Sequence, residues 1–200
     1  MNDSSEKITA HDKISNSRYN RVAIALHWLL AMGLIYQLSL GIWMDGVPKT
    51  PPGLRADWFN WHKSVGMVLG LLIVLRVLWR LTHASPALPR TMPRWQQRGA
   101  SLSHALLYGC MVVMPLSGFL GSSFTKYPIK FFGMPLPRLW EANPDLKALC
   151  GSVHTGASYL FMLVIALHVA AALMHLLRRD GVFSRMWPAS QLVQTVGTPG

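Results

Sequence analysis

The chain has 200 residues and a formal net charge of +11, yet only 14% of its residues are charged and 51% are hydrophobic. This composition excludes an ordinary soluble domain, and the basic residues lie at the ends of apolar runs, which argues against a nucleic-acid-binding domain. Uncharged apolar runs of 18 or more residues are typical of membrane-spanning helices. Three such runs and a weaker fourth predict an all-α integral membrane protein, a four-helix bundle in the lipid bilayer.

The first predicted span covers residues 21–44 and follows a polar segment, residues 1–17, which we expect to be a cytoplasmic tail. The span is uncharged from residue 22 to its end, which is long enough to cross the hydrocarbon core of a bilayer. His27 lies six residues inside it, about 9 Å along the helix axis. An imidazole at that depth is costly and needs a partner.

The second predicted span covers residues 58–81 and is the weakest by hydropathy, because two basic residues interrupt it. Tryptophans at both ends are typical of the two membrane interfaces. His62 lies near its start, and Gly66 and Gly70 follow on the same helical face. We expect these glycines either to pack against a neighbouring helix or to let a flat ligand approach the backbone.

The third and fourth predicted spans cover residues 99–125 and 148–177, and both are uncharged throughout. His104 lies near the start of the third span. The fourth span holds three histidines, separated by 14 and 7 residues, which places all three near one stripe of a single helix. They are His154, His168 and His175. Residues 189–200 are predicted to form a disordered tail, so the membrane domain spans residues 18–188.

The basic residues also predict the orientation. Twelve of the nineteen Lys and Arg residues lie before the first span, in or beside the connection between the second and third spans, or after the fourth. Such residues concentrate on the cytoplasmic side of membrane proteins. We therefore expect both termini to be cytoplasmic.

The histidines match in level between helices. His62 and His154 are expected in the outer half of the membrane, whereas His27, His104 and His168 are expected in the inner half. A haem iron takes one imidazole from each side of its plane, and the macrocycle fills the space between helices. This pattern predicts two haem sites, and the absence of a CxxCH motif excludes covalent c-type attachment.

Spacing alone leaves the inner pair open. His27 could face His168, His175 or His104. His175 lies 21 residues from His154, about 31 Å along the helix, which is nearly the full hydrocarbon thickness and indicates a position at the inner surface.

Five separated motifs resemble the bacterial cytochrome b561 family of four-helix, membrane-bound b-type cytochromes. They are RVAIALHWLLA (21–31), WHKSVGMVLGLLIVLRVLWR (61–80), MPRWQQRGASLSHALLYGCMVVMPLSG (92–118), FFGMPLP (131–137) and SVHTGASYLFMLVIALHVAAALMHLLRRDGVFSRMWP (152–188). The resemblance implies two non-covalent haems b, the outer held by His62 with His154 and the inner by His27 with His168. It leaves His104 and His175 as alternative ligands or supporting residues.

The resemblance also implies a function in the bacterial inner membrane. Family members pass electrons between a periplasmic donor and quinone or another membrane acceptor. Oxidation of superoxide with reduction of ubiquinone is one such activity; the other role is that of a simple electron carrier. A different class of protein has the same arrangement of four helices with several histidines: the membrane-anchor cytochrome b subunit of a larger dehydrogenase or hydrogenase.

Overall fold

Four long helices make up the membrane domain. The computed structural model describes residues 18–50, 53–86 and 92–188, so both predicted tails lie outside the described residues. The four helices, α2 to α5, are all long and apolar enough to cross a bilayer. Their bounds are Arg21–Asp45 for α2, Leu54–Thr82 for α3, Arg94–Ser123 for α4 and Pro144–Arg178 for α5.

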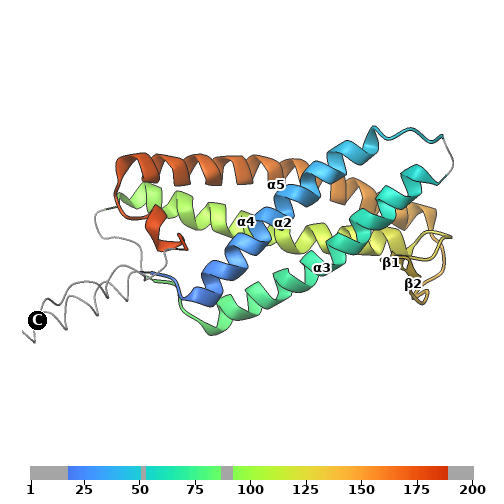
Figure 1. The fold of residues 1–200 in the computed structure, drawn as a ribbon, viewed down its shortest axis with the longest axis horizontal. Coiled ribbons are helices and arrows are strands. Elements are labelled where there is room, and N and C mark those ends of the chain that lie inside the picture. The colour runs from blue at the N-terminus through green and yellow to red at the C-terminus, as the bar shows by residue number, and fades with distance from the viewer. Residues whose placement is uncertain (1–17, 51–52, 87–91, 189–200) are drawn as a thin grey trace, which may run out of the picture.

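The helices form two antiparallel pairs that cross each other. In Figure 1, α4 and α5 run side by side, and the pair formed by α2 and α3 crosses them at an angle. A short 3-10 helix, η1 (Phe183–Arg185), follows α5 at the left-hand end of the view. At the other end, the strands β1 (Lys130–Phe131) and β2 (Met134–Pro135) form a small antiparallel hairpin. The fold is therefore the expected all-α four-helix bundle.

Three helices begin four or five residues before the positions that hydropathy predicts. In α5 the reason is local: Asn143 caps the helix by accepting a hydrogen bond from the backbone N–H of Leu146, and Pro144 occupies the first turn. An acidic residue in that first turn, Asp145, also suits the helix dipole. Charged residues therefore belong to the helix ends, although they lie outside the hydrocarbon-spanning stretch.

The side chains follow the pattern expected in lipid. Large apolar residues lie exposed along the outside, with Leu81 77% and Leu177 83% exposed. The buried apolar core is small and lies at the middle of the bundle, where all four helices contribute to it: Leu30, Leu69, Ile73, Cys110, Met111 and Phe161. Since lipid is as apolar as leucine, the exposed residues need no protein partner, and packing at the centre is left to a few side chains.

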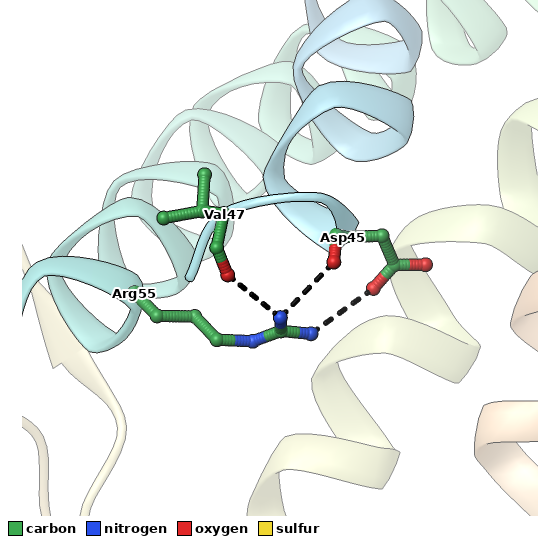
Figure 2. A network of polar contacts seen from close by, with 3 residues as sticks. All are labelled: Asp45, Val47 and Arg55. Atoms are coloured by element: carbon green, nitrogen blue, oxygen red, sulfur yellow. Dashed lines mark hydrogen bonds and ion pairs between the residues drawn. The ribbon is translucent and has the colours of Figure 1, made fainter. Parts of the chain in front are cut away.

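The turn between α2 and α3 is closed by one arginine. The Arg55 guanidinium donates hydrogen bonds to the carbonyl oxygens of Asp45 (3.0 Å) and Val47 (2.9 Å) and lies 3.5 Å from the Asp45 carboxylate, as Figure 2 shows. Trp43 and Trp58 pack edge to face beside it. These contacts fix how far α2 and α3 are displaced along each other, and hence which of their residues lie opposite one another.

The opposite end is closed by the segment that follows α5. The Trp28 indole N–H donates to the Met186 carbonyl (2.8 Å), and Arg18 donates to the Trp187 carbonyl (2.8 Å). Trp28 also packs edge to face on Trp187. Because this segment continues from α5 and contacts the start of α2, it links two helices that are far apart in the sequence.

Ser64 attaches the outer hairpin to the membrane domain. It is 1% exposed, accepts a hydrogen bond from the Phe132 backbone N–H (2.9 Å) and lies within donating distance of the carbonyls of Asn60 and Lys130. A buried N–H without an acceptor costs about 1–3 kcal/mol. The hairpin is therefore held over α3 by the Ser64 hydroxyl, together with the edge-to-face contact of Phe132 with Trp61.

We predict that Ser64→Ala loosens the hairpin without unfolding the bundle. Amide hydrogen exchange at Phe132 should become roughly tenfold faster, because its buried N–H loses its acceptor. Hydrogen–deuterium exchange in nanodiscs measures this effect. Ser158→Ala is the matched control, since that exposed hydroxyl bonds only within its own helix. Unchanged exchange at Phe132 would contradict the proposed role of Ser64.

Candidate functional site

Two histidines on different helices face each other in the outer half of the bundle. His62 lies on α3 and His154 on α5, with ring centroids 6.4 Å apart and ring planes at 83°. Both side chains are half-buried. Residues 92 positions apart are thus brought to one level by the crossing of the two helix pairs.

The inner half holds a similar arrangement with a third member. His27 on α2 and His168 on α5 have ring centroids 6.3 Å apart, and the His104 ring on α4 lies 5.7 Å from that of His168. His168 is therefore shared by both contacts. The structure brings all three together, and distance alone favours neither His27 nor His104 as its partner.

These separations fit two imidazoles that bind one iron from opposite sides. Metal–imidazole bonds are about 2.0 Å long, so ring centres across a single metal lie roughly 6 Å apart. A bare metal ion is a poorer fit, because within residues 18–50, 53–86 and 92–188 no group of three or more His, Cys, Asp or Glu side chains is placed to hold one. A haem needs only two ligands from the protein, since its macrocycle supplies the other four.

The surroundings of His154 leave one ring nitrogen free. Its Nδ1 lies 3.0 Å from the Met114 carbonyl and 3.2 Å from the Ser117 hydroxyl. A carbonyl only accepts hydrogen bonds, so Nδ1 carries the proton and donates it. The lone pair of Nε2 is then available to a metal, and this hydrogen bond to Nδ1 is the usual support of a metal-bound histidine.

Two glycines give the outer imidazoles their space. A Cβ at Gly118 would lie 3.0 Å from Cε1 of His154, and a Cβ at Gly41 would lie 3.4 Å from Cε1 of His62. Any side chain at Gly118 would therefore force the His154 ring to move. Neither glycine is recognisable as a site residue from the sequence, because its role depends on a histidine of another helix that packs against it.

The glycines that the sequence does highlight face protein neighbours. A Cβ at Gly66 would lie 3.0 Å from the amide nitrogen of Gln37, and one at Gly70 would lie 3.4 Å from Pro115. Of the two roles expected for them, packing against a neighbouring helix is the one that the structure places them in. Gly66 lets a polar side chain approach α3, one turn from His62.

His175 lies apart from the two histidine groups. Its Nδ1 is 2.6 Å from the Asp180 carboxylate, beyond the end of α5. Desolvation acts to raise the pKa of Asp180, but hydrogen bonds from His175 and the Val182 backbone outweigh it and hold that pKa below its ordinary value. His175 thus pairs with a surface carboxylate near the turn that leads into η1.

The helix α5 contacts the other helices unequally. In the part of the chain that the structure describes, α5 packs closely on α4, but its backbone stays mostly clear of α2 and α3. Its histidines nevertheless face those of α2 and α3. Facing imidazoles on helices whose backbones are not closely packed suit a flat cofactor in a bundle core.

A cavity of about 1270 Å³ opens at the inner end, between α3, α4 and the start of α2. His104 lines it, and no acidic residue does, whereas three arginines do: Arg18, Arg76 and Arg80. Arg76 donates one hydrogen bond, to the Ala23 carbonyl (3.0 Å). A cavity with this lining suits a ligand that carries carboxylate or phosphate groups.

Comparison with known proteins agrees with this arrangement. A family model described as prokaryotic cytochrome b561 matches residues 18–189. Cytochrome b561 homolog 1 of Escherichia coli K12 is 27% identical over 176 residues, which cover 86% of this chain and 98% of the relative. Cytochrome b561 homolog 2 of the same strain is 29% identical over 178 residues, with coverage of 84% and 90%.

A third relative, the probable superoxide oxidase CybB of Yersinia pestis, is 27% identical over 181 residues, which cover 86% of this chain and 97% of that protein. The family match extends over the whole membrane domain, and its four helices are long and apolar enough to span a membrane. The protein therefore belongs to the prokaryotic cytochrome b561 family of membrane electron-transfer proteins, which carry b-type haem.

Proposed function

We propose that this protein carries two haems b and passes electrons from a periplasmic donor to quinone, with superoxide as the donor. The observation that carries the proposal is the pairing of histidines at two levels of one helix, 6.4 Å apart at the outer level and 6.3 Å at the inner. His62 with His154 would hold the outer haem. His27 with His168 would hold the inner one.

Each haem supplies a one-electron couple, and the chain sets its surroundings. His154 is held through Nδ1 by the Met114 carbonyl, which leaves Nε2 as the ring nitrogen that could bind the iron. Arg76 and Arg80 line the inner cavity and would neutralise the carboxylates of the inner haem. The buried core around Phe161 excludes water between the two levels.

The outer face offers charge for an anionic donor. Lys63 follows His62 directly on α3, and Lys147 lies in the first turn of α5. A local excess of positive charge raises the concentration of small anions near the surface. Lys126 and Lys130 add to it from the loop that carries the hairpin. The name of the Yersinia relative supports superoxide as the anion.

The overall reaction balances for this donor. Two superoxide anions each lose one electron and leave as O₂. One quinone takes up the two electrons with two protons and becomes quinol. The chain has no acidic residue inside the predicted spans, so the protons for quinol would come from the aqueous side at which the quinone is reduced.

We predict that the purified protein binds two haems per chain and that His62→Ala or His154→Ala reduces this to one. Removal of either imidazole leaves one side of the outer iron without a protein ligand. A pyridine haemochrome assay with oxidised and reduced spectra measures the content. His175→Ala is a suitable control, because that ring pairs with Asp180 beyond the end of α5, outside both histidine groups. Two intact low-spin haems in both outer variants would refute the outer pairing.

At the inner level, His27→Ala should remove one haem, whereas His104→Ala should retain two. This difference follows if His27 is the partner of His168 and His104 is a neighbour that lines the cavity. Low-spin signals in electron paramagnetic resonance, recorded on both variants, report the ligation directly. The reverse result would assign the inner iron to His104 and His168.

Both termini should be cytoplasmic. The start of α2, the ends of α3 and α5 and the start of α4 all lie at one end of the bundle, and the chain segments there carry most of its basic residues. A phosphatase fused after residue 200 should therefore be inactive, and one fused into the loop between α2 and α3 active. An active C-terminal fusion would reverse the orientation and move the outer histidines to the cytoplasmic half.

If the chain instead serves as the membrane anchor of a larger enzyme, it should copurify from membranes with a soluble redox subunit and should not reduce quinone alone. Stopped-flow mixing of the purified protein with superoxide and a short-chain quinone separates the two functions. Reduction of the haems followed by their reoxidation supports the proposed activity.

A further inference from the structure

The contact between α2 and α3 contains two polar atoms with no visible partner. They are Oε1 of Gln37 and Nδ1 of His62, both buried and without a hydrogen bond among the residues that the structure describes. Buried polar atoms without partners are rare and costly. One of these atoms can only accept a hydrogen bond, and the other becomes a donor once His62 binds a metal through Nε2.

The two residues are already joined by another bond. Nε2 of Gln37 donates to the backbone carbonyl of His62 at 2.8 Å. This contact fixes the orientation of the amide, because its oxygen would be repelled by the carbonyl oxygen. The unpaired atom is therefore the amide oxygen, and it belongs to a side chain that is tethered to the residue holding the unpaired nitrogen.

Each of the two helices has a glycine opposite the polar side chain of the other. Gly66 lies opposite Gln37, where a Cβ would come within 3.0 Å of the amide nitrogen, and Gly41 lies opposite His62, where a Cβ would come within 3.4 Å of the ring. Gly66 is one turn from His62, and Gly41 is one turn from Gln37. At two adjacent turns, a side chain of one helix therefore lies against a glycine of the other helix.

The outer pair is otherwise asymmetric. His154 already has acceptors for its Nδ1 proton in Met114 and Ser117, whereas His62 has none in the described residues. Metal-bound histidines almost always donate their second ring proton to an acceptor, which fixes the ring and makes it a stronger donor to the metal. Gln37 is the tethered side chain that carries a spare acceptor beside His62.

We propose that Gln37 is the positioning residue of His62. Its Nε2 holds the His62 backbone, and its Oε1 would accept the Nδ1 proton when Nε2 of the ring binds the iron; the two atoms do not bond to each other in this structure. The inference rests on the proposed function, since it requires His62 to bind the outer haem. It predicts that Gln37 sets the redox potential of one haem and leaves the other unchanged.

The test compares Gln37→Leu with Gln37→Glu in the holoprotein. Leucine keeps the volume but removes both bonds, so His62 becomes a weaker donor to the iron and one couple should move upward. We expect about a tenfold change in the ratio of reduced to oxidised haem at fixed potential, equivalent to about 59 mV for one electron. Optical redox titration measures both couples, and electron paramagnetic resonance reports the ligation.

Gln37→Glu provides the rescue. A carboxylic acid buried in the membrane stays neutral, so it keeps one donor and one acceptor, and both couples should match the wild type. Ser39→Ala, an exposed position two residues away on α2, is the matched control and should also leave both couples unchanged.

Three results would overturn the inference: unchanged couples in Gln37→Leu, equal shifts of both couples, or a shift in Gln37→Glu as large as that in Gln37→Leu. Failure of the underlying function looks different. In that case the wild type binds fewer than two haems, or His62→Ala retains both. If Gln37→Leu does not assemble, wild-type couples in Gln37→Glu support the role, and one shifted couple there contradicts it.

Discussion

A buried imidazole needs a partner on each ring nitrogen, and this constraint governs how the four helices meet. His154 satisfies one nitrogen with a carbonyl of α4, and its ring centroid lies 6.4 Å from that of His62 on α3. His168 faces both α2 and α4. The helix α5 thus packs on α4 along its length and meets α2 and α3 at the apolar core around Phe161 and at the facing histidine rings. A bundle of this kind is completed by its cofactor, because apolar packing alone leaves those nitrogens unsatisfied.

Long-range order of this type depends on hydrogen bonds at the helix ends, where polar side chains reach the backbone carbonyl groups of a neighbouring segment. Arg55 closes the outer turn between α2 and α3 through two carbonyl groups, and its contacts fix the offset at which Gln37 meets Gly66 and His62 meets Gly41. At the inner end, Trp28 binds the segment after α5. The Arg55 and Trp28 contacts set the distances between helices that share few buried side chains. The separations of the histidine rings therefore depend on these two contacts.

The fold could be predicted from the sequence, because the length and polarity of a membrane span are set by the bilayer rather than by tertiary contacts. The histidines that face each other could also be proposed, since the 14-residue spacing of His154 and His168 shows in the chain itself. The supporting residues could not. Gly118, Gly41 and Gln37 look like ordinary residues of apolar helices, and their roles arise from residues on other helices. The inner partner of His168 stayed open for a related reason: two helices begin at the same depth, and each brings a histidine there.

The separation of the two histidine levels is itself fixed by α5. His154 and His168 lie on one continuous helix, about 21 Å apart along its axis. Phe161 lies halfway between them, is 1% exposed and belongs to the apolar core to which all four helices contribute. That core forms a dry layer between two polar levels. The helix α5 is rigid and sets the spacing of the two histidine levels, and Phe161 excludes water from the region between them. A substitution of a residue that contacts His62 should therefore affect the outer level alone, whereas a substitution of Phe161 should affect both levels.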